Sequence, residues 1–185
     1  MKTRNRIIIC LIVIGTSLLI LVQGIIIPKN NQEKKQYIIE QQEPTTHDLE
    51  SILKYKSKYM GNFSNMVNLF HTLPLNNKPR TFELFSDNTM DVNYKENIEN
   101  ISGDKLSKAL IYNSTAAFAL IDNLQGINYN FTDGKYIVQR SDIEKWYGED
   151  LLKLLTKDEW KSKVQVKLED EEYIKSASEV LLIKD

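Results

Sequence analysis

The segment Ile7–Ile27 reads IIICLIVIGTSLLILVQGIII and contains no Asp, Glu, Lys or Arg. At about 1.5 Å per residue, a helix of this length covers roughly the 30 Å hydrocarbon core of a bilayer. Three basic residues lie within positions 1–6, and a polar run follows from Pro28. Because positively charged flanks stay in the cytoplasm, the sequence predicts a cytoplasmic N-terminus at 1–6, a single transmembrane helix at 7–27, and all later residues outside the cytoplasm.

A cleaved signal peptide is the alternative interpretation of this segment. Signal peptides have an apolar region of about 7–15 residues before a small-residue cleavage site, and Val22–Gly24 resembles such a site. Cleavage after Gly24 would leave Ile25–Ile27 as an exposed apolar N-terminus, so the length favours an uncleaved anchor. A lipoprotein signal is excluded because Cys10 lies near the start of the apolar run, not at its end.

Charge and cysteine content restrict the outer part of the chain. The whole chain has a net charge of −1, and without the three basic residues before Pro28 it has 21 basic and 25 acidic residues, a net of −4. Nucleic-acid binding needs a basic surface, so we expect no nucleic-acid partner. The single cysteine lies in the apolar segment, so the outer domain contains no disulfide and depends on its apolar core.

The outer part divides into a polar linker at 28–44 and a domain at 45–185. The linker, PKNNQEKKQYIIEQQEP, is rich in charged and amide side chains. Thr45–Asp48 has the form of a capping box and predicts a first helix that ends before Gly61. Ser64 is positioned to cap a second helix, which Pro74 ends.

Two alternating patterns predict β-hairpins on either side of a long helix. Residues 81–84 and 89–94 alternate around a turn at Ser86–Asn88, and residues 127–132 and 135–138 alternate around Asp133-Gly134. Residues 105–122 have apolar positions on more than one helical face, and we expect Asn113 there to be a buried amide that bonds a loop backbone. The order predicts an α+β domain in which two hairpins form an antiparallel sheet packed by helices.

Shorter helices are predicted after the second hairpin. Ser141–Glu144 has the form of a capping box, and Gly148 is positioned to end the helix that it opens. Thr156 begins another turn, Glu169–Glu172 is acidic, and residues 180–183 predict a last strand.

Four groups of residues recur along the chain in a characteristic order: Tyr59–Ser64 leading to Leu73-Pro74, Tyr112–Thr115 running into Phe118–Asn123, Tyr129–Phe131, and Lys145–Leu151. In this order and spacing they resemble the family called domain of unknown function 4825. The resemblance spans roughly His47–Ser176. It implies a bacterial extracytoplasmic domain on a membrane or lipid anchor, and similar domains form the tails of BlaR-type metallopeptidases. That association implies sensing or interaction, and the family supplies no catalytic residue.

No zinc-peptidase, nucleophile-elbow or nucleotide-binding motif is present. The chain lacks H-E-x-x-H, G-x-S-x-G, a P-loop and G-x-G-x-x-G, and we expect no catalytic residue, no metal and no cofactor. His47 and His71 are predicted at the surface. Glu149-Asp150 could contribute to a carboxylate pair, but adjacent acidic residues at a helix start usually complement the helix dipole.

The predicted binding surface combines Asn128 and Asn130 with Trp146 and Tyr147, because amides and aromatic rings suit a glycan, a peptide or a partner protein. The alternative is that the two aromatic residues belong to the core. The sequence therefore favours a single-pass membrane protein whose outer domain binds or senses another envelope or membrane protein or a wall glycan. A cell-envelope hydrolase that uses carboxylates and a structural envelope protein are the alternatives.

Overall fold

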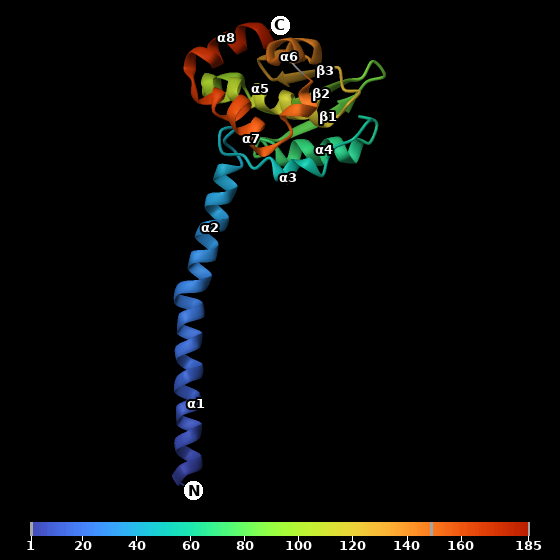
Figure 1. Cartoon of the computed structure of the whole chain (residues 1–185). Coiled ribbons are helices and arrows are strands. Elements are labelled where there is room, and N and C mark those ends of the chain that lie inside the picture. Colours follow the sequence, from blue (N-terminus) through green and yellow to red (C-terminus); the bar gives the residue numbers. More distant parts are fainter. Residues whose placement is uncertain (1, 149, 185) are drawn as a thin grey trace. The chain divides into compact units, whose positions relative to one another are not determined.

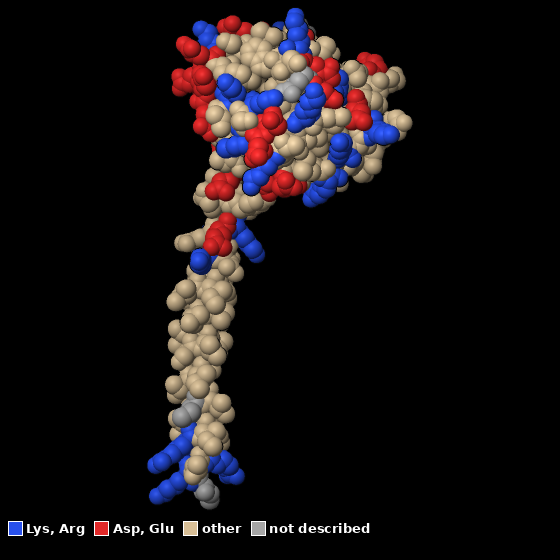
Figure 2. Space-filling model, viewed as in Figure 1, with Lys and Arg blue, Asp and Glu red and all other residues tan. Residues whose placement is uncertain are grey.

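The computed structural model describes residues 2–148 and 150–184, and only the backbone of Cys10. The chain consists of two compact units, residues 1–40 and 41–185. The first unit is an unbroken helical rod formed by α1 (Lys2–Leu21), η1 (Val22–Ile26) and α2 (Ile27–Glu40) (Figure 1). Among the described residues, this rod is the one helix long and apolar enough to cross a membrane. Basic side chains gather at its N-terminal end (Figure 2).

The turn η1 is a π-helix because of Pro28. Proline has no backbone N–H, so it cannot donate to the carbonyl four residues earlier, and its ring crowds that carbonyl. Widening the preceding turn at Val22–Ile26 relieves the conflict without breaking the rod. The helix consequently continues to Glu40 through most of the segment predicted as a linker. The second unit begins at Gln41, four residues before the start predicted for the folded domain.

A five-stranded sheet forms one layer of the second unit. Its strands lie in the order β1 (Arg80–Leu84), β2 (Thr89–Tyr94), β3 (Gly126–Phe131), β4 (Gly134–Gln139) and β5 (Ile183–Lys184). Both predicted hairpins are present, as β1–β2 and β3–β4. The predicted antiparallel sheet was wrong, however, because β2 and β3 pair in parallel.

The parallel pair follows from the helix between the hairpins. Helix α5 (Gly103–Leu120) carries the chain back along the sheet after β2, so β3 starts at the same end as β2 and runs in the same direction. The last strand is also shorter than predicted. The first two residues of the segment 180–183 are the last two of helix α8 (Glu171–Leu181), and only Ile183–Lys184 pair with β4.

The core is organised around α5. Every residue from Ala109 to Ile121 is buried, as expected for a helix that is apolar on several faces. The Ser114 hydroxyl bonds the Tyr129 hydroxyl of β3 at 3.0 Å, which joins α5 to the sheet. The predicted role of Asn113 is confirmed, because its Nδ2 donates to the Pro74 carbonyl at 2.9 Å.

Arg140, the residue directly after β4, caps the C-terminal end of α5. Arg140 Nη2 donates to the carbonyls of Phe118 at 2.7 Å and Ile121 at 2.5 Å, and its Nε donates to the Leu124 carbonyl at 2.6 Å. The guanidinium therefore satisfies carbonyls that the helix leaves without partners, and its charge complements the helix dipole.

The helices before the sheet differ in detail from the predicted ones. The first is a single turn, α3 (Glu50–Leu53), because the chain soon becomes extended and Ser57 forms a bridge with Ile121. Helix α4 (Phe63–Thr72) is capped by Asn62, whose side chain accepts the Asn65 amide, and not by Ser64. A 3₁₀ turn, η2 (Ile98–Asn100), lies in the polar connection before α5.

The C-terminal layer contains α6 (Arg140–Tyr147), η3 (Leu151–Leu154), α7 (Lys157–Glu159), η4 (Trp160–Gln165), η5 (Lys167–Glu169) and α8. The predicted start of α6 was wrong, because β4 passes into the helix at Gln139 without a loop and Ser141 lies inside the first turn. Gly148 ends α6 in the left-handed conformation, as predicted. The side chain of Thr156 caps α7, also as predicted.

A buried polar network joins this C-terminal layer to α5 and to the entry segment, residues 41–48. His47 was predicted at the surface but is 2 % exposed. Its Nδ1 lies 2.9 Å from the Tyr112 hydroxyl, and its Nε2 lies 3.0 Å from the Thr72 carbonyl. Because a carbonyl only accepts, Nε2 carries the hydrogen and Nδ1 accepts from Tyr112. Trp160 Nε1 in turn donates to the Tyr112 hydroxyl at 3.1 Å.

This network predicts acid sensitivity. Burial lowers the pKa of His47 against the weaker opposing effects of the Thr72 hydrogen bond and Asp48. The unfolded chain therefore binds a proton that the folded chain resists, so stability is complete above the ordinary histidine pKa of about 6.5 and falls below it. We expect the free energy of unfolding, measured by urea titration, to fall more steeply between neutral and mildly acidic pH in the wild type than in His47→Gln.

Glutamine is the matched replacement because it offers one donor and one acceptor and does not titrate. His71→Gln is the control, since His71 is exposed. Parallel pH dependences for the wild type and His47→Gln would contradict the assignment.

Candidate functional site

The two predicted asparagines lie in a polar row on the face of the sheet opposite the core. The parallel register places Asn128 beside Asp91 and Asn130 beside Asn93. Asn128 Nδ2 donates to Asp91 Oδ1 at 2.7 Å, and Asn130 Nδ2 donates to Asp91 Oδ2 at 3.0 Å and to Asn93 Oδ1 at 2.7 Å. The four side chains are half-buried, and the amides are largely occupied with one another.

The two predicted aromatic residues have different neighbours. Trp146 Nε1 donates to the Tyr173 hydroxyl of α8 at 2.7 Å, and the two rings meet edge to face with centroids 5.5 Å apart. Trp146 and Tyr147 are half-buried and pack against the core. Among the described residues, no hydrogen bond or ring contact joins this pair to Asn128 or Asn130. The predicted surface therefore divides into a polar row and a separate aromatic cluster.

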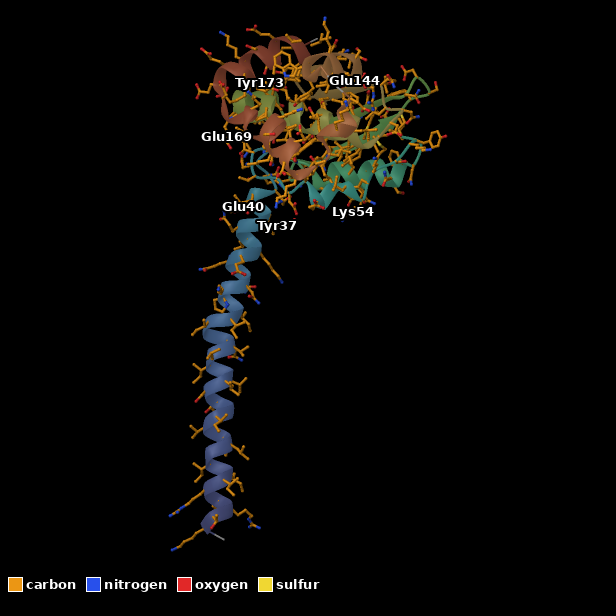
Figure 3. The ribbon with its side chains drawn as sticks, viewed as in Figure 1. Tyr37, Glu40, Lys54, Glu144, Glu169 and Tyr173 are labelled. Atoms are coloured by element: carbon orange, nitrogen blue, oxygen red, sulfur yellow. The ribbon has the colours of Figure 1, made fainter. Side chains whose placement is uncertain are left out.

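The aromatic cluster lines a pocket of about 380 Å³. Its described lining residues come from α6, η4, η5 and α8, and Tyr173 is labelled in Figure 3. We call it the aromatic–lysine pocket; it is lined by Trp146, Tyr147, Lys163, Lys167 and Tyr173.

Local sequence explains how these residues meet. Gly148 ends α6 directly after the two aromatic residues. Asp170 caps α8 by accepting the amides of Glu172 and Tyr173, which places Tyr173 in the first turn of that helix. Lys163 and Lys167 are four residues apart in the consecutive turns η4 and η5.

Two lysines supply the positive charge of the pocket. Burial raises the pKa of the Tyr147 phenol, and its hydroxyl oxygen lies in the interior, so Tyr147 contributes ring surface to the lining. Lys163 Nζ forms an ion pair with Glu159 at 2.8 Å, which holds this side chain in place. Of the lining residues that the structure describes, two are basic and none is acidic. The pocket therefore offers aromatic surface and positive charge.

A second hollow, of about 360 Å³, is lined by four basic residues, most of which form hydrogen bonds or ion pairs with other residues of the protein. They are His71, Lys78, Arg80 and Lys95. Arg80 donates to the carbonyls of Phe70, Leu75 and Lys78 and to His71 Nδ1. Burial lowers the pKa of Arg80, while slight burial and the Arg80 charge lower that of His71.

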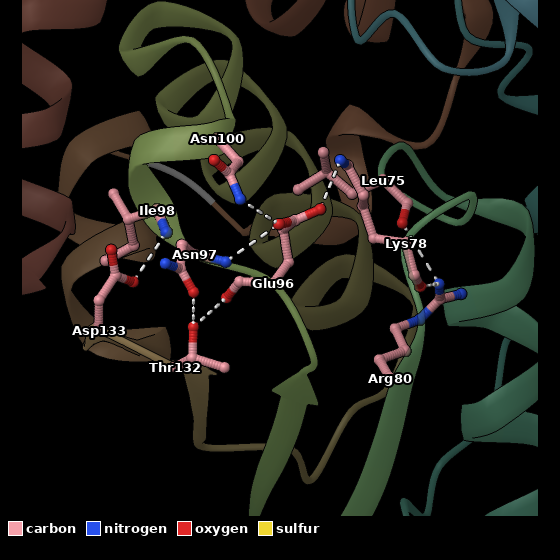
Figure 4. A network of polar contacts seen from close by, with 9 residues as sticks. All are labelled: Leu75, Lys78, Arg80, Glu96, Asn97, Ile98, Asn100, Thr132 and Asp133. Carbon is pink, nitrogen blue, oxygen red and sulfur yellow. Dashed lines mark hydrogen bonds and ion pairs between the residues drawn. The ribbon is translucent and has the colours of Figure 1, made fainter.

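Lys78 of this hollow belongs to a structural network on neighbouring loops (Figure 4). Its Nζ forms an ion pair with Glu96 at 2.8 Å, and Asn100 donates to the same carboxylate at 2.7 Å. These hydrogen bonds lower the pKa of Glu96 to about 2. Asp133, in the turn between β3 and β4, accepts the Ile98 amide of η2 at 2.8 Å. These bonds hold the two loops together, so the network is structural.

The carboxylate pair considered from the sequence, Glu149-Asp150, is described only at Asp150, because Glu149 lies outside the described residues. Asp150 caps η3 by accepting the Leu152 amide at 2.9 Å. Within residues 2–148 and 150–184, no group of three or more His, Cys, Asp or Glu side chains is placed to hold a metal ion.

The family model for a domain of unknown function, DUF4825, matches residues 52–142. This region is a DUF4825 domain. It runs from α3 to the first turn of α6, so the DUF4825 domain contains α4, α5, four strands and the polar row. The aromatic–lysine pocket is built from residues after Asp142, outside the matched region. No curated protein and no solved structure matches the chain.

Sequence patterns identified only part of the aromatic–lysine pocket. Trp146 and Tyr147 were predicted, whereas Lys163, Lys167 and Tyr173 were not. The available signal was the four-residue spacing of the two lysines, which places them on one helical face. That spacing does not indicate which other helix lies beside the face.

Proposed function

We propose that this protein is a single-pass membrane protein whose outer unit is a binding or sensing module. The apolar rod supplies a span, and the basic residues at positions 1–6 favour a cytoplasmic N-terminus. Residues 41–185 then face outward. A DUF4825 domain has no assigned activity, so the proposal depends on the chemistry of the pocket.

The aromatic–lysine pocket is the observation that carries this proposal. Its volume lies within the range of about 300–1,000 Å³ that is typical of small-molecule sites. The lining residues that the structure describes provide ring surfaces and ammonium groups, which suit binding. None of them is a histidine, cysteine, serine or carboxylate, so the described lining lacks the residues of a Ser–His or Cys–His catalytic pair. We therefore propose a binding role without catalysis and without a cofactor.

The proposed partners are a wall glycan or another membrane or envelope protein. A net charge of −4 after the apolar segment argues against nucleic acid.

Topology is tested with a tag placed after Asp185 in whole protoplasts. We expect added protease to remove the tag while a cytoplasmic marker stays intact, because the outer unit faces the medium. A tag that is digested only after lysis would overturn the proposed orientation.

Binding is tested by capture from intact envelopes with the tagged full-length chain. We expect the wild type and Tyr59→Ala, which removes an aromatic side chain that is 68 % exposed outside the pocket, to retain the same wall polymer or membrane protein. Trp146→Ala should lose it. Equal retention by Trp146→Ala would exclude the pocket as the site, and no retention by the wild type would exclude the binding role.

A further inference from the structure

Two lysines, Lys163 and Lys167, line the pocket. They lie four residues apart on consecutive helical turns, where like charges repel. Glu159 forms an ion pair with Lys163, whereas Lys167 has no ion pair with the described residues. A ligand oxyanion beside Lys167 would compensate this charge and make charge-assisted hydrogen bonds.

The aromatic residues of the lining offer ring surface. The indole N–H of Trp146 is already bonded to the Tyr173 hydroxyl. What Trp146 offers a ligand is therefore its apolar ring, held in place by the edge-to-face contact with Tyr173. Such a rigid ring suits the flat C–H face of a sugar, and the Tyr173 hydroxyl, which accepts from Trp146, can still donate to a sugar hydroxyl.

We propose that the aromatic–lysine pocket binds an acidic sugar. The sugar ring lies against Trp146 and Tyr173, and a carboxylate or phosphate on that sugar lies between Lys163 and Lys167. This inference rests on the proposed binding function and names the ligand class for the same site. The residues that select the acidic group follow the DUF4825 match, so acidic-sugar recognition is a property of the C-terminal segment of this chain.

The test compares sugars that differ in a single acidic group, with the full-length chain in lipid nanodiscs. N-acetylmuramic acid carries a carboxylate that N-acetylglucosamine lacks, and N-acetylglucosamine 1-phosphate carries a phosphate instead. We expect calorimetry to give at least about tenfold tighter binding of one acidic sugar than of the neutral one, since hydrogen bonds to charged groups are strong. The tighter of the two acidic sugars identifies a carboxylate or a phosphate as the anion.

Variants separate the two halves of the pocket. The double change Lys163→Gln with Lys167→Gln should abolish the preference for acidic sugars, while Trp146→Ala should weaken the binding of all three. Lys153→Gln removes an exposed lysine outside the pocket and should leave the preference unchanged. Thermal unfolding of each variant checks that the pocket lysines act on binding and not on folding.

Equal affinity for acidic and neutral sugars, or no binding of any of the three, would overturn this inference. A preference that survives the double lysine change would overturn it as well. Failure of the wider function has a different signature. If envelope capture still depends on Trp146 while the acidic preference is absent, the binding role stands and only the ligand class is wrong.

Discussion

Replacing Arg140 with methionine is expected to lower the free energy of unfolding by about 3–5 kcal/mol, because hydrogen bonds to charged groups are each worth roughly 1.5–3 kcal/mol and are not fully additive. The guanidinium bonds three carbonyls at and beyond the end of α5. The Arg140 side chain is only 12 % exposed, so water cannot replace it without opening the core. Methionine fills similar space but leaves the carbonyls without donors.

Urea unfolding of the full-length chain in detergent micelles, followed by tryptophan fluorescence, measures this loss. Glu144→Gln is the matched control, because it removes the ion-pair partner of Arg140 while leaving the three carbonyl bonds intact. The Glu144 side chain is 46 % exposed, so we expect little change from this control. Equal stability of Arg140→Met and Glu144→Gln would show that the carbonyl bonds do not stabilise the fold.

Replacing Tyr112 with phenylalanine is expected to cost about 3 kcal/mol, because each buried polar group left without a partner costs roughly 1–3 kcal/mol. Removing this hydroxyl leaves two buried groups unpaired at once, Nδ1 of His47 and Nε1 of Trp160. The aromatic ring remains, so packing against Trp160 is kept and the loss reports the hydrogen bonds.

The comparison for this prediction is Tyr129→Phe. The Tyr129 hydroxyl bonds a single partner, Ser114, whose hydroxyl is free to rotate, so we expect a cost of only about 1 kcal/mol. Both variants are measured by the same urea unfolding. If Tyr112→Phe cost no more than Tyr129→Phe, the two hydrogen bonds of the Tyr112 hydroxyl would not stabilise the fold as proposed.

Local patterns predicted the elements of this fold better than their arrangement. Alternation identified both hairpins, and Asp133-Gly134 marked the turn between β3 and β4. The direction in which one hairpin joins the other depends on where α5 packs, and alternation carries no information about that. The burial of His47 also escaped prediction, since its partners Tyr112 and Thr72 lie 65 and 25 residues away.

The candidate site was predictable to the same limited extent. Amides and aromatic rings were noted as candidate binding side chains, but their partners within the protein come from distant segments. Asp91, which bonds Asn128, lies 37 residues away, and Tyr173 lies 27 residues beyond Trp146. The family resemblance was confirmed over 52–142, a narrower range than expected. Spacing within a helix or strand identifies a face, whereas tertiary packing decides which two faces meet.

The entry segment, residues 41–48, has a consequence for synthesis. Gln165 Nε2 donates to the carbonyls of Pro44 at 3.0 Å and His47 at 2.8 Å, partners that precede it by well over one hundred positions. The first residues of the second unit therefore lack these two hydrogen bonds until almost the whole chain has been synthesised. Folding of this unit should be a late, cooperative event, and chains truncated before Trp160 should be degraded by cellular proteases.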